Sequence, residues 1–424
     1  MNLNNIFRFA EFAMKIILVN YRYFISGGPE RYYFNIKEVL EKHGHEVIPF
    51  SIKSSRNLPN DYERYFLDMV DDEVYFAQTK KSLKVVLKSF TRMFYSFEAK
   101  KKFKQLLLDT KPDLVYIMQF HNKISPSIID AAKSLNVPVI HRISDFQYMC
   151  PNALFYNDVK GVCEDCLKGK RLHCIKYKCV LNSTVYSGIK MVAKWLHDVM
   201  GVTKKMDAFV VPSSFTLGKL KEYGIPEKKL NHIPTFFNLK EENPIVEYKP
   251  FVLFVGRIEK QKGLMTLIKA FEGTEYNLKI IGFSNDGYEE ELKLYLQGKH
   301  HHIEFLGRKS FEEIVPYLKS CLCTTVPSEW YDNFPNVILE SFAYKKAVIA
   351  TNFGSLPELV RHHETGLTFE YADIKDFKDK ITYMFEHPEE AKKMGEQGYR
   401  NILSNYSPEA HYKQLTYLFE QVIK

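Results

Sequence analysis

The sequence predicts an α/β protein of two tandem domains, each a doubly wound parallel sheet covered by helices. A chain of 424 residues exceeds one ordinary core and fits two domains of typical size. In both halves, short apolar strand patterns alternate with amphipathic helix patterns, which is typical of parallel sheets buried on both faces. Such folds bind ligands at the carboxyl ends of their strands, so we expect the two domains to face a ligand cleft.

The first domain is expected to cover residues 1–235. It opens with the apolar run Lys15–Asn20, a loop containing Gly27 and Gly28, and a helix from Glu30 to His43. Further strands are expected at residues 46–50, 113–118, 138–143 and 208–211. Residues 1–13 lack the apolar run and cleavage site of a secretory signal, so Met14 is an alternative start to Met1.

The polar, proline-bearing segment 236–250 is the expected linker, and residues 251–405 form the second domain. Its strands are expected at residues 251–255, 278–281, 303–306, 322–325 and 347–350. A capping box, Ser310–Glu313, predicts the start of one of its helices. Residues 406–424 are expected to form a last helical segment.

The composition is that of a soluble globular protein, with 45% hydrophobic and 26% charged residues. No stretch approaches the roughly 20 uninterrupted apolar residues that a membrane span requires. Residues 1–250 carry 38 Lys and Arg against 26 Asp and Glu, whereas residues 251–424 carry 21 against 25. The positive half indicates an anionic partner: a nucleic acid, an anionic membrane face or a phosphorylated acceptor. Because no nucleic-acid reader motif is recognised, we expect no nucleic-acid partner.

Two cations lie where the second domain begins. Arg257 follows the strand 251–255, and Lys262–Gly263 stands at the start of the next helix. A helix N-terminus with its free amides stabilises an anionic diphosphate, for which Arg supplies a planar fork and Lys a point charge. The alternative interpretation is a solvated basic loop.

Two carboxylates bracket a second helix start, at Asp332 and Glu340, where a polar turn enters a helix at Pro335. Glu340 can accept hydrogen bonds from both hydroxyls of a ribose. Asp332, with the amides around Asn333 and Phe334, can face the hydroxyls of a transferred sugar. Alternatively, Glu340 is a solvated helix residue.

Together these segments resemble the family 4 glycosyltransferases, retaining enzymes of the GT-B fold with two Rossmann-like domains, from about Met14 to the C-terminus. The resemblance implies that Arg257 and Lys262 hold the diphosphate of a UDP- or GDP-linked sugar. It places the other donor contacts on Gly28, Gly307, Asp332, Asn333, Phe334, Asn336 and Glu340. It also implies that residues 406–424 cross back to the first domain. Asp332 and Pro335 depart from the family's usual Glu and Gly.

The acceptor side is expected in the first domain. Gly27 and Gly28 resemble the family's glycine-rich first loop, where the backbone approaches donor phosphate or acceptor, although a plain tight turn fits equally. His121 matches the position of the family's active-site histidine and, with Arg257, Lys262 and Asp332, is expected to act in catalysis; a structural histidine is the alternative. Asp145 matches a family His-Asp segment, or is a capped turn.

Basic residues and aromatics alternate between Lys80 and Lys104. Lys81, Lys84, Lys88 and Arg92 fall near one helical face, which fits peripheral contact with an anionic membrane. Solvated lysines above core aromatics are the alternative.

Four cysteines, Cys163, Cys166, Cys174 and Cys179, occur within 17 residues of an expected insertion at about 150–180. Their short spacings suit a tetrahedral structural zinc, with free buried thiols as the alternative. Seven cysteines in an unsecreted chain indicate thiols or metal ligands rather than disulfides.

The expected function is transfer of a hexose-like sugar, with retention, to an acceptor hydroxyl on a lipid-linked or surface-polysaccharide precursor. No Asp-x-Asp triplet is present to hold a divalent cation, so no catalytic cofactor is expected. We expect a cytoplasmic protein, peripheral on the inner face of the cell membrane. The rivals are a nucleotide-sugar epimerase of GT-B fold and a non-catalytic binding scaffold. The sugar, the base and the acceptor depend on pocket details that the sequence does not reveal.

Overall fold

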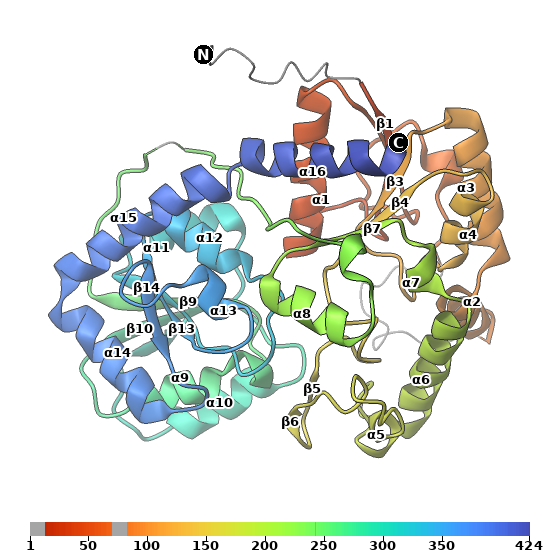
Figure 1. Cartoon of the computed structure of the whole chain (residues 1–424). Helices are drawn as coiled ribbons and strands as arrows, with labels where there is room; N and C mark the ends of the chain where they lie inside the picture. Colours follow the sequence, from red (N-terminus) through yellow and green to blue (C-terminus); the bar gives the residue numbers. More distant parts are fainter. Residues whose placement is uncertain (1–12, 70–82, 242) are drawn as a thin grey trace, which may run out of the picture. The chain divides into compact units, whose positions relative to one another are not determined.

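The computed structural model describes residues 13–69, 83–241 and 243–424. In the second range, side chains are described from residue 89 onward. It contains two six-stranded sheets, ordered β2-β1-β3-β4-β7-β8 and β11-β10-β9-β12-β13-β14 (Figure 1). The predicted α/β class, two doubly wound parallel sheets in tandem, is therefore confirmed. Two compact units result. The first comprises the described part of residues 1–142 with 197–209 and 416–424, and the second comprises 143–196 and 210–415.

In the first sheet β1 is the second strand from one edge and pairs in parallel with β2 and β3. Residues 16–19 of β1 are fully buried, as expected for a strand covered on both faces. The strands are β1 (Lys15–Val19), β2 (Glu46–Phe50), β3 (Leu114–Ile117), β4 (Val139–Arg142), β7 (Ala208–Val211) and β8 (Leu230–His232).

The helices of the first unit begin with α1 (Gly28–Lys42), α2 (Leu83–Phe94) and α3 (Phe97–Thr110), followed by α4 (Ser127–Lys133) and α7 (Val202–Lys205). Residues 416–424, at the end of α16 (Pro408–Ile423), belong to the same unit. There Phe419 packs edge-on against Tyr116, with ring centroids 5.4 Å apart.

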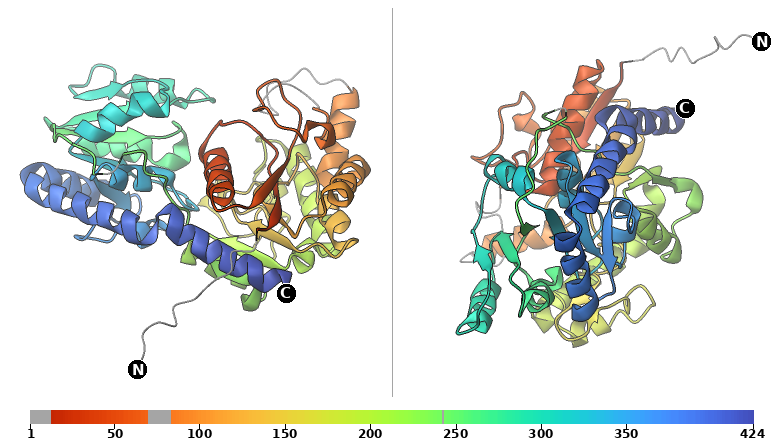
Figure 2. Two further views of the ribbon diagram at one scale, coloured as in Figure 1. Left: turned by 90° about the horizontal axis from the view of Figure 1, so that it is seen from above. Right: turned by 90° about the vertical axis from the view of Figure 1, so that its left-hand side faces the viewer.

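The second sheet is parallel at every pairing. Its strands are β9 (Phe251–Val255), β10 (Asn277–Ile281), β11 (Ile303–Phe305), β12 (Cys323–Val326), β13 (Ala347–Thr351) and β14 (Gly366–Phe369). Alternate residues of β9 enter two different apolar clusters, Val252 and Phe254 in one and Phe251 and Leu253 in the other. Both faces are thus buried, because helices cover each of them (Figures 1 and 2).

One face is covered by α9 (Leu264–Phe271), α10 (Tyr288–Leu296) and α14 (Ile374–Glu386), and the other by α11 (Phe311–Ser320), α12 (Asn336–Ala343) and α13 (Leu356–Leu359). The helix α15 (Pro388–Asn405) contributes side chains to both clusters. The capping box predicted at Ser310 is confirmed, with both of its hydrogen bonds formed.

Three features differ from the predictions. The strands β8 and β14 and the hairpin β5–β6 (Tyr156–Asn157 and Gly161–Val162) were not expected, because two to four residues carry too little periodicity. The helix α12 begins at Asn336, with Pro335 outside it. Residues 143–196, which include α5 (His173–Lys176) and most of α6 (Thr184–Val199), group with the second unit rather than the first.

Candidate functional site

The carboxyl ends of β9, β10 and β11 carry a row of glycines. The Gly256 amide donates to Ile281 O and the Gly282 amide to Gly307 O, both at 3.0 Å. A Cβ added to Gly282 would lie 1.9 Å from Gly256 O, so only glycine allows the two loops to approach this closely. Gly307 was predicted as a donor contact, whereas Gly282 was missed although it directly follows an apolar run. The contact of Gly307 with a nucleobase remains a prediction.

A second close approach places Lys262. The 3-10 turn Lys260–Lys262 ends at Gly263, which has φ +70° and caps the N-terminus of α9. A Cβ on Gly263 would lie 1.8 Å from Pro327 O. Glycine is therefore required both by the left-handed backbone and by the contact, which brings Lys262 to the loop that follows β12.

In that loop Lys262 pairs with Asp332. The Lys262 Nζ lies 2.6 Å from Asp332 Oδ2, which also accepts a hydrogen bond from Ser328 Oγ at 3.0 Å. The two charged side chains are only 18% and 12% exposed, so the pair is largely removed from water. The Lys262 Nζ also lies 4.9 Å from the centroid of the Trp330 ring. Both residues were predicted as donor contacts, but their pairing with each other was not.

Arg257 stands on a more open surface, with its side chain 45% exposed. Its guanidinium donates to Glu259 Oε1, while Glu259 Oε2 accepts from Gln261 Nε2 at 2.6 Å. Burial raises the pKa of Glu259, although Arg257 opposes this effect. Sequence reasoning missed Glu259. The pattern that could have indicated it is a single acidic residue between the two predicted phosphate-binding cations. Each of the two cations therefore has a carboxylate partner.

In the loop from Asp332 to α12, the side chain of Asn333 makes structural hydrogen bonds. Asn333 Oδ1 accepts from Thr216 Oγ1 at 2.6 Å, and its Nδ2 donates to Ile143 O at 3.1 Å. Among the described residues, the main-chain amides of Asn333 and Phe334 have no hydrogen-bond partner. Asn336 begins α12, and Glu340 on that helix is 4% exposed. The alternative interpretation of Glu340 as a solvated residue is therefore wrong.

Tyr331 connects this loop to the cysteine-rich segment. Its ring packs 4.6 Å from Phe215 and 4.7 Å from Phe353, centroid to centroid. Its hydroxyl donates to Glu164 Oε1 at 2.9 Å, and Lys219 Nζ lies 2.7 Å from the same carboxylate. Although burial acts to raise it, these two partners hold the pKa of Glu164 below its usual range. Sequence reasoning missed this contact, for which the only signal was an aromatic pair before Asp332.

Trp330, which precedes Tyr331, is a further residue that sequence reasoning missed. Its indole is buried, and within the part of the chain that the structure describes Nε1 has no hydrogen-bond partner. Glu358, on α13, accepts hydrogen bonds from the amides of Ser214 and Phe215 at 2.8 and 2.7 Å. Glu358 thus caps α8 (Ser214–Glu222), where a carboxylate is stabilised by the helix dipole.

The glycine-rich loop of the first unit has a carboxylate in its first helical turn. Gly27 is extended, and α1 begins at Gly28, two residues earlier than predicted. Glu30 is buried and accepts hydrogen bonds from Arg22 at 3.2 Å and from Ser26 Oγ at 3.0 Å. Glu30 already places a negative charge at the start of α1. An anionic ligand at this helix start would therefore lie close to a carboxylate of the same sign. The roles of Gly27 and Gly28 remain predictions.

His121 follows β3 in the first unit, where its ring centroid lies 3.9 Å from that of Phe120 and 5.7 Å from that of His141, both in tilted arrangements. Burial lowers the pKa of His141 to about 3. Asp145, in the second unit, accepts from the Gln147 amide at 2.9 Å, which is the capped turn considered as its alternative role. Burial raises the pKa of Asp145 to about 6. The acceptor-side roles of His121 and Asp145 remain predictions.

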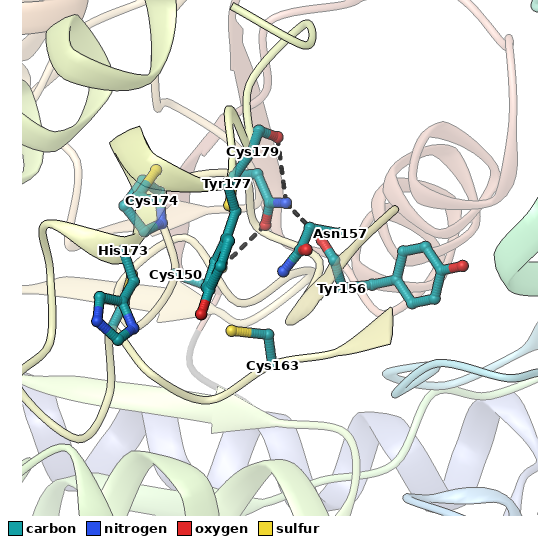
Figure 3. Close-up of a pocket in the computed structure, with 11 residues that line it drawn as sticks. Cys150, Tyr156, Asn157, Cys163, His173, Cys174, Tyr177 and Cys179 are labelled. Carbon is teal, nitrogen blue, oxygen red and sulfur yellow. Dashed lines mark hydrogen bonds between the residues drawn. The ribbon is translucent and has the colours of Figure 1, made fainter. Parts of the chain in front are cut away.

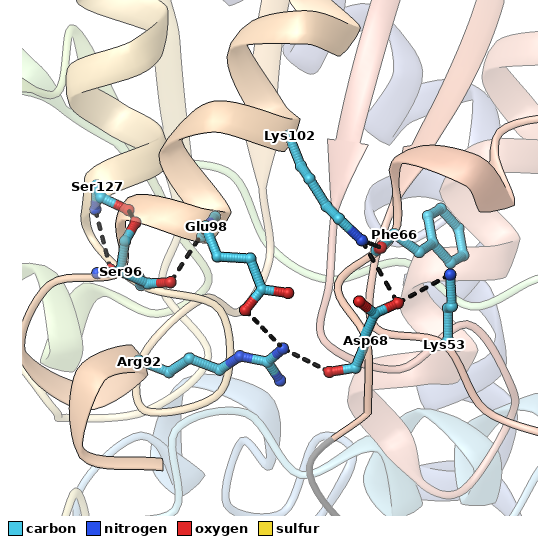
Figure 4. Close-up of polar contacts among 10 residues, drawn as sticks. Lys53, Phe66, Asp68, Arg92, Ser96, Glu98, Lys102 and Ser127 are labelled. Carbon is cyan, nitrogen blue, oxygen red and sulfur yellow. Dashed lines mark hydrogen bonds and ion pairs between the residues drawn. The ribbon is translucent and has the colours of Figure 1, made fainter. Parts of the chain in front are cut away.

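The proposed membrane-facing helix is only partly described. Lys81 and the side chains of Lys84 and Lys88 lie outside the described residues. Arg92 points inward, lies 3.7 Å from Glu98 and donates to Asp68 O (Figure 4). The assignment of Arg92 to a surface face is therefore wrong, because its side chain is buried and its guanidinium is engaged by these two partners. None of the helices in the described ranges is both long and apolar enough to cross a bilayer.

Five thiols of the second unit line one small pocket, together with His173 (Figure 3). They are the four predicted cysteines and Cys150. Burial raises the pKa of Cys150 to about 11 and that of Cys166 to about 12. A metal ion needs several His, Cys, Asp or Glu ligand atoms close together. Among the described residues, the only three such atoms that all lie within 4.8 Å of one another belong to Glu275, His300 and His302. The predicted zinc site is not decided by this geometry.

Comparisons with known proteins find a family match within the second half of the chain. Residues 235–401 match the family described as glycosyl transferases group 1. An uncharacterized glycosyltransferase of Methanocaldococcus jannaschii is 38% identical over 35% of this chain and 42% of its own length. The D-rhamnosyltransferase WbpZ of Pseudomonas aeruginosa is 32% identical over 39% of this chain and 41% of its own length. The chain thus spans about two-fifths of the length of these curated relatives.

Solved structures cover nearly the whole chain. Sucrose-phosphate synthase of Thermosynechococcus elongatus has a TM-score of 0.68 at 18% identity, over 96% of this chain and 98% of its own. Anabaena HepE in complex with UDP has a TM-score of 0.63 at 15% identity, over 96% and 100%. At these identities the likeness establishes the fold. The chain therefore has the GT-B fold, and its residues 235–401 carry the sequence pattern of the group 1 glycosyl transferases.

Proposed function

We propose that the protein is a retaining glycosyltransferase that moves a sugar from a UDP- or GDP-linked donor to an acceptor hydroxyl. The observation that carries this proposal is the placement of Lys262. Its amine stands at the N-terminus of α9, fixed by Gly263 and paired with Asp332 away from water. A diphosphate that reaches this site meets a desolvated cation, for which electrostatic stabilisation is strong.

The proposed step breaks the bond between the sugar and the diphosphate, and negative charge develops on the leaving group. Lys262, Arg257 and the amides of α9 would stabilise that charge without a catalytic metal. Glu340 would hold the ribose. The unpartnered amides of Asn333 and Phe334, with Asp332, would contact the sugar, since the Asn333 side chain is already engaged.

The acceptor is proposed to be a lipid-linked or surface-polysaccharide precursor, with His121 and Asp145 on the acceptor side. The relatives support this class by name, since one is a rhamnosyltransferase and another an uncharacterized 42.6 kDa protein of a Klebsiella pneumoniae cps region, 23% identical over 90% of this chain. We propose a cytoplasmic location at the inner membrane face. The positive charge of residues 1–250 would suit anionic lipids.

Turnover of nucleotide sugars by the purified chain tests the proposal. After a thermal-shift screen for the donor, Lys262→Ala should lower sugar transfer by about 100-fold or more, because it removes a charge that acts in the transition state. Lys260→Ala is the matched control: it lies in the same turn, is exposed, and pairs with Glu291 at 3.6 Å. Added magnesium or manganese should leave the rate unchanged.

Each rival predicts a different result. Conversion of the free donor into its epimer, with no acceptor product, would identify an epimerase. Donor binding without turnover across a broad acceptor panel would identify a scaffold. Absence of a thermal shift with every UDP- and GDP-sugar would contradict the donor site itself.

A further inference from the structure

We infer that Glu275, His300 and His302 form a binding site for a divalent metal ion such as zinc, at the amino ends of two strands of the second sheet. One ligand atom from each residue lies within 4.8 Å of the other two. Two imidazole nitrogens and one carboxylate oxygen are a ligand set that zinc uses in proteins, with a further position left for water. This site shares no residue with the thiol pocket or with the donor contacts.

The pairing of β10 with β11 brings the three residues together. Leu278 is paired with Ile303, and the Leu278 amide donates to His302 O at 2.9 Å. Counted back three residues along both chains, this register aligns Glu275 with His300, which agrees with their clustering. Glu275 therefore enters the cluster from the segment before β10, and both histidines enter it from the segment before β11.

The two histidines are separated by one residue, a spacing that puts side chains on the same side of an extended chain. The centroids of the His300 and His302 rings lie 5.0 Å apart. His301, between them, has its Nδ1 turned to the Ile303 amide, from which it accepts a hydrogen bond at 3.3 Å. His300 and His302 therefore share one ion, while His301 takes no part.

Two of the three ligands are already in contact, since His302 Nε2 lies 3.0 Å from Glu275 Oε2. Zinc bonds of about 2.0–2.2 Å to nitrogen and oxygen place tetrahedral ligand atoms roughly 3.3–3.5 Å apart. Side-chain rotations that close the widest separation by about 1.5 Å therefore bring all three atoms to one ion. The side chains of Glu275 and His302 are 82% and 35% exposed, so both have room to make this movement.

The lysine that precedes the histidines is engaged elsewhere. Lys299 Nζ lies 2.6 Å from Glu272 Oε1 and 3.4 Å from the centroid of the Tyr295 ring. Its positive charge is thus directed to Glu272. The cluster itself combines one carboxylate with two imidazoles, which ligate metal ions in their neutral form.

A metal ion at this site would act on the sheet and not on the transfer reaction. The strand β11 lies at the edge of its sheet and has only three residues. The cluster precedes the amino ends of β10 and β11, whereas Gly282 and Gly307 follow their carboxyl ends. An ion that joins the two amino ends would fasten the short edge strand to its neighbour and stabilise the folded state through its binding free energy.

Zinc titration of the full chain, after treatment with EDTA and under reducing conditions, tests the site. His301→Gln is the matched control, because it lies in the same run and removes no ligand; zinc held by the thiols contributes equally to all variants. At a zinc concentration 100-fold above Kd, the rise in Tm should be smaller in Glu275→Gln, His300→Gln and His302→Gln than in His301→Gln, by about 2–5 °C. Magnesium, which prefers oxygen ligands, should give no shift in any of them.

Modification of histidines by diethyl pyrocarbonate, followed residue by residue with tandem mass spectrometry, locates the ion. Zinc should slow the modification of His300 and His302 several-fold and leave that of His301 unchanged. Equal Tm shifts in all four variants, no protection of the two histidines, or an equal shift with magnesium would overturn the inference. Protection of His301 together with its neighbours would overturn the ligand set. None of these results depends on donor turnover, so this site and the proposed transferase can fail separately.

Discussion

Two neighbouring regions of the second unit are held in place by different means. The donor loops, residues 256–263 and 328–336, follow directly from β9 and β12, whose pairing register fixes where each loop begins. The cysteine segment, residues 150–182, has no strand longer than two residues among its described elements. Its backbone is held by hydrogen bonds within turns and by side chains such as Asn152. Regular strands can therefore position Lys262 with little help, whereas the cysteine segment depends on a few specific contacts.

The largest effect is expected where the donor loops meet. Asp332→Ala would leave the Lys262 amine largely buried without its counter-ion, which should lower the free energy of unfolding by about 2–4 kcal/mol. Urea denaturation followed by circular dichroism measures this change. Asp379→Ala, on an exposed face of α14, is the control. Equal losses in the two variants would mean that strand geometry alone holds the donor loops.

The contact of Glu164 with Tyr331 joins the two regions and predicts a smaller, kinetic effect. If the protein is the proposed transferase, Glu164→Gln should raise the KM for the donor a few-fold, with little change in kcat, since it weakens the support of the loop that carries Asp332. Glu222→Gln is matched, because Glu222 also pairs with Lys219 but is more exposed. A KM effect of the same size in Glu222→Gln would show that the charge on Lys219 matters, and not the link to Tyr331.

The smallest effect is expected at Asp145, just before the cysteine segment. Its folded pKa of about 6 exceeds the usual value of about 3.9, so folding favours the protonated carboxyl, and stability is lost as the pH rises from about 4 through about 6. Asp145→Asn should therefore raise Tm by about 2–4 °C at pH 7.5 and by less at pH 5. Differential scanning fluorimetry measures both values. Asp158→Asn, at an exposed position, is the control, and a pH-independent gain at Asp145 would rule out a titrating carboxyl.

The same difference explains how much could be predicted from the sequence. Strands such as β1 and β9 are recognisable because they are unbroken apolar runs, and Lys262 and Asp332 follow from their positions next to such strands. Their pairing could not be foreseen, because it joins residues 70 apart through a backbone contact at Gly263. The hydrogen bond between Tyr331 and Glu164 spans 167 residues and leaves no local pattern.

Charge patterns were the least reliable guide. Arg92 was assigned to a surface face by helical periodicity, but its partners Glu98 and Asp68 belong to segments outside its own helix, and a helical wheel does not include them. In the cysteine segment, spacing alone selected Cys174 over Cys150. In the structure Cys150 lines the same pocket as the four spaced cysteines, which a list of intervals cannot show.

The contact at Gly263 also constrains how this protein can change over evolutionary time. Even one methyl group there would overlap the carbonyl of Pro327, so single substitutions at position 263 displace a loop that lies more than sixty residues away in the chain. Position 263 therefore cannot change by neutral drift unless the backbone of the loop at Pro327 also shifts. Because the overlapped atom is a main-chain carbonyl, no substitution at position 327 relieves the contact. We therefore expect glycine to be retained at position 263 in relatives that place this lysine in the same way.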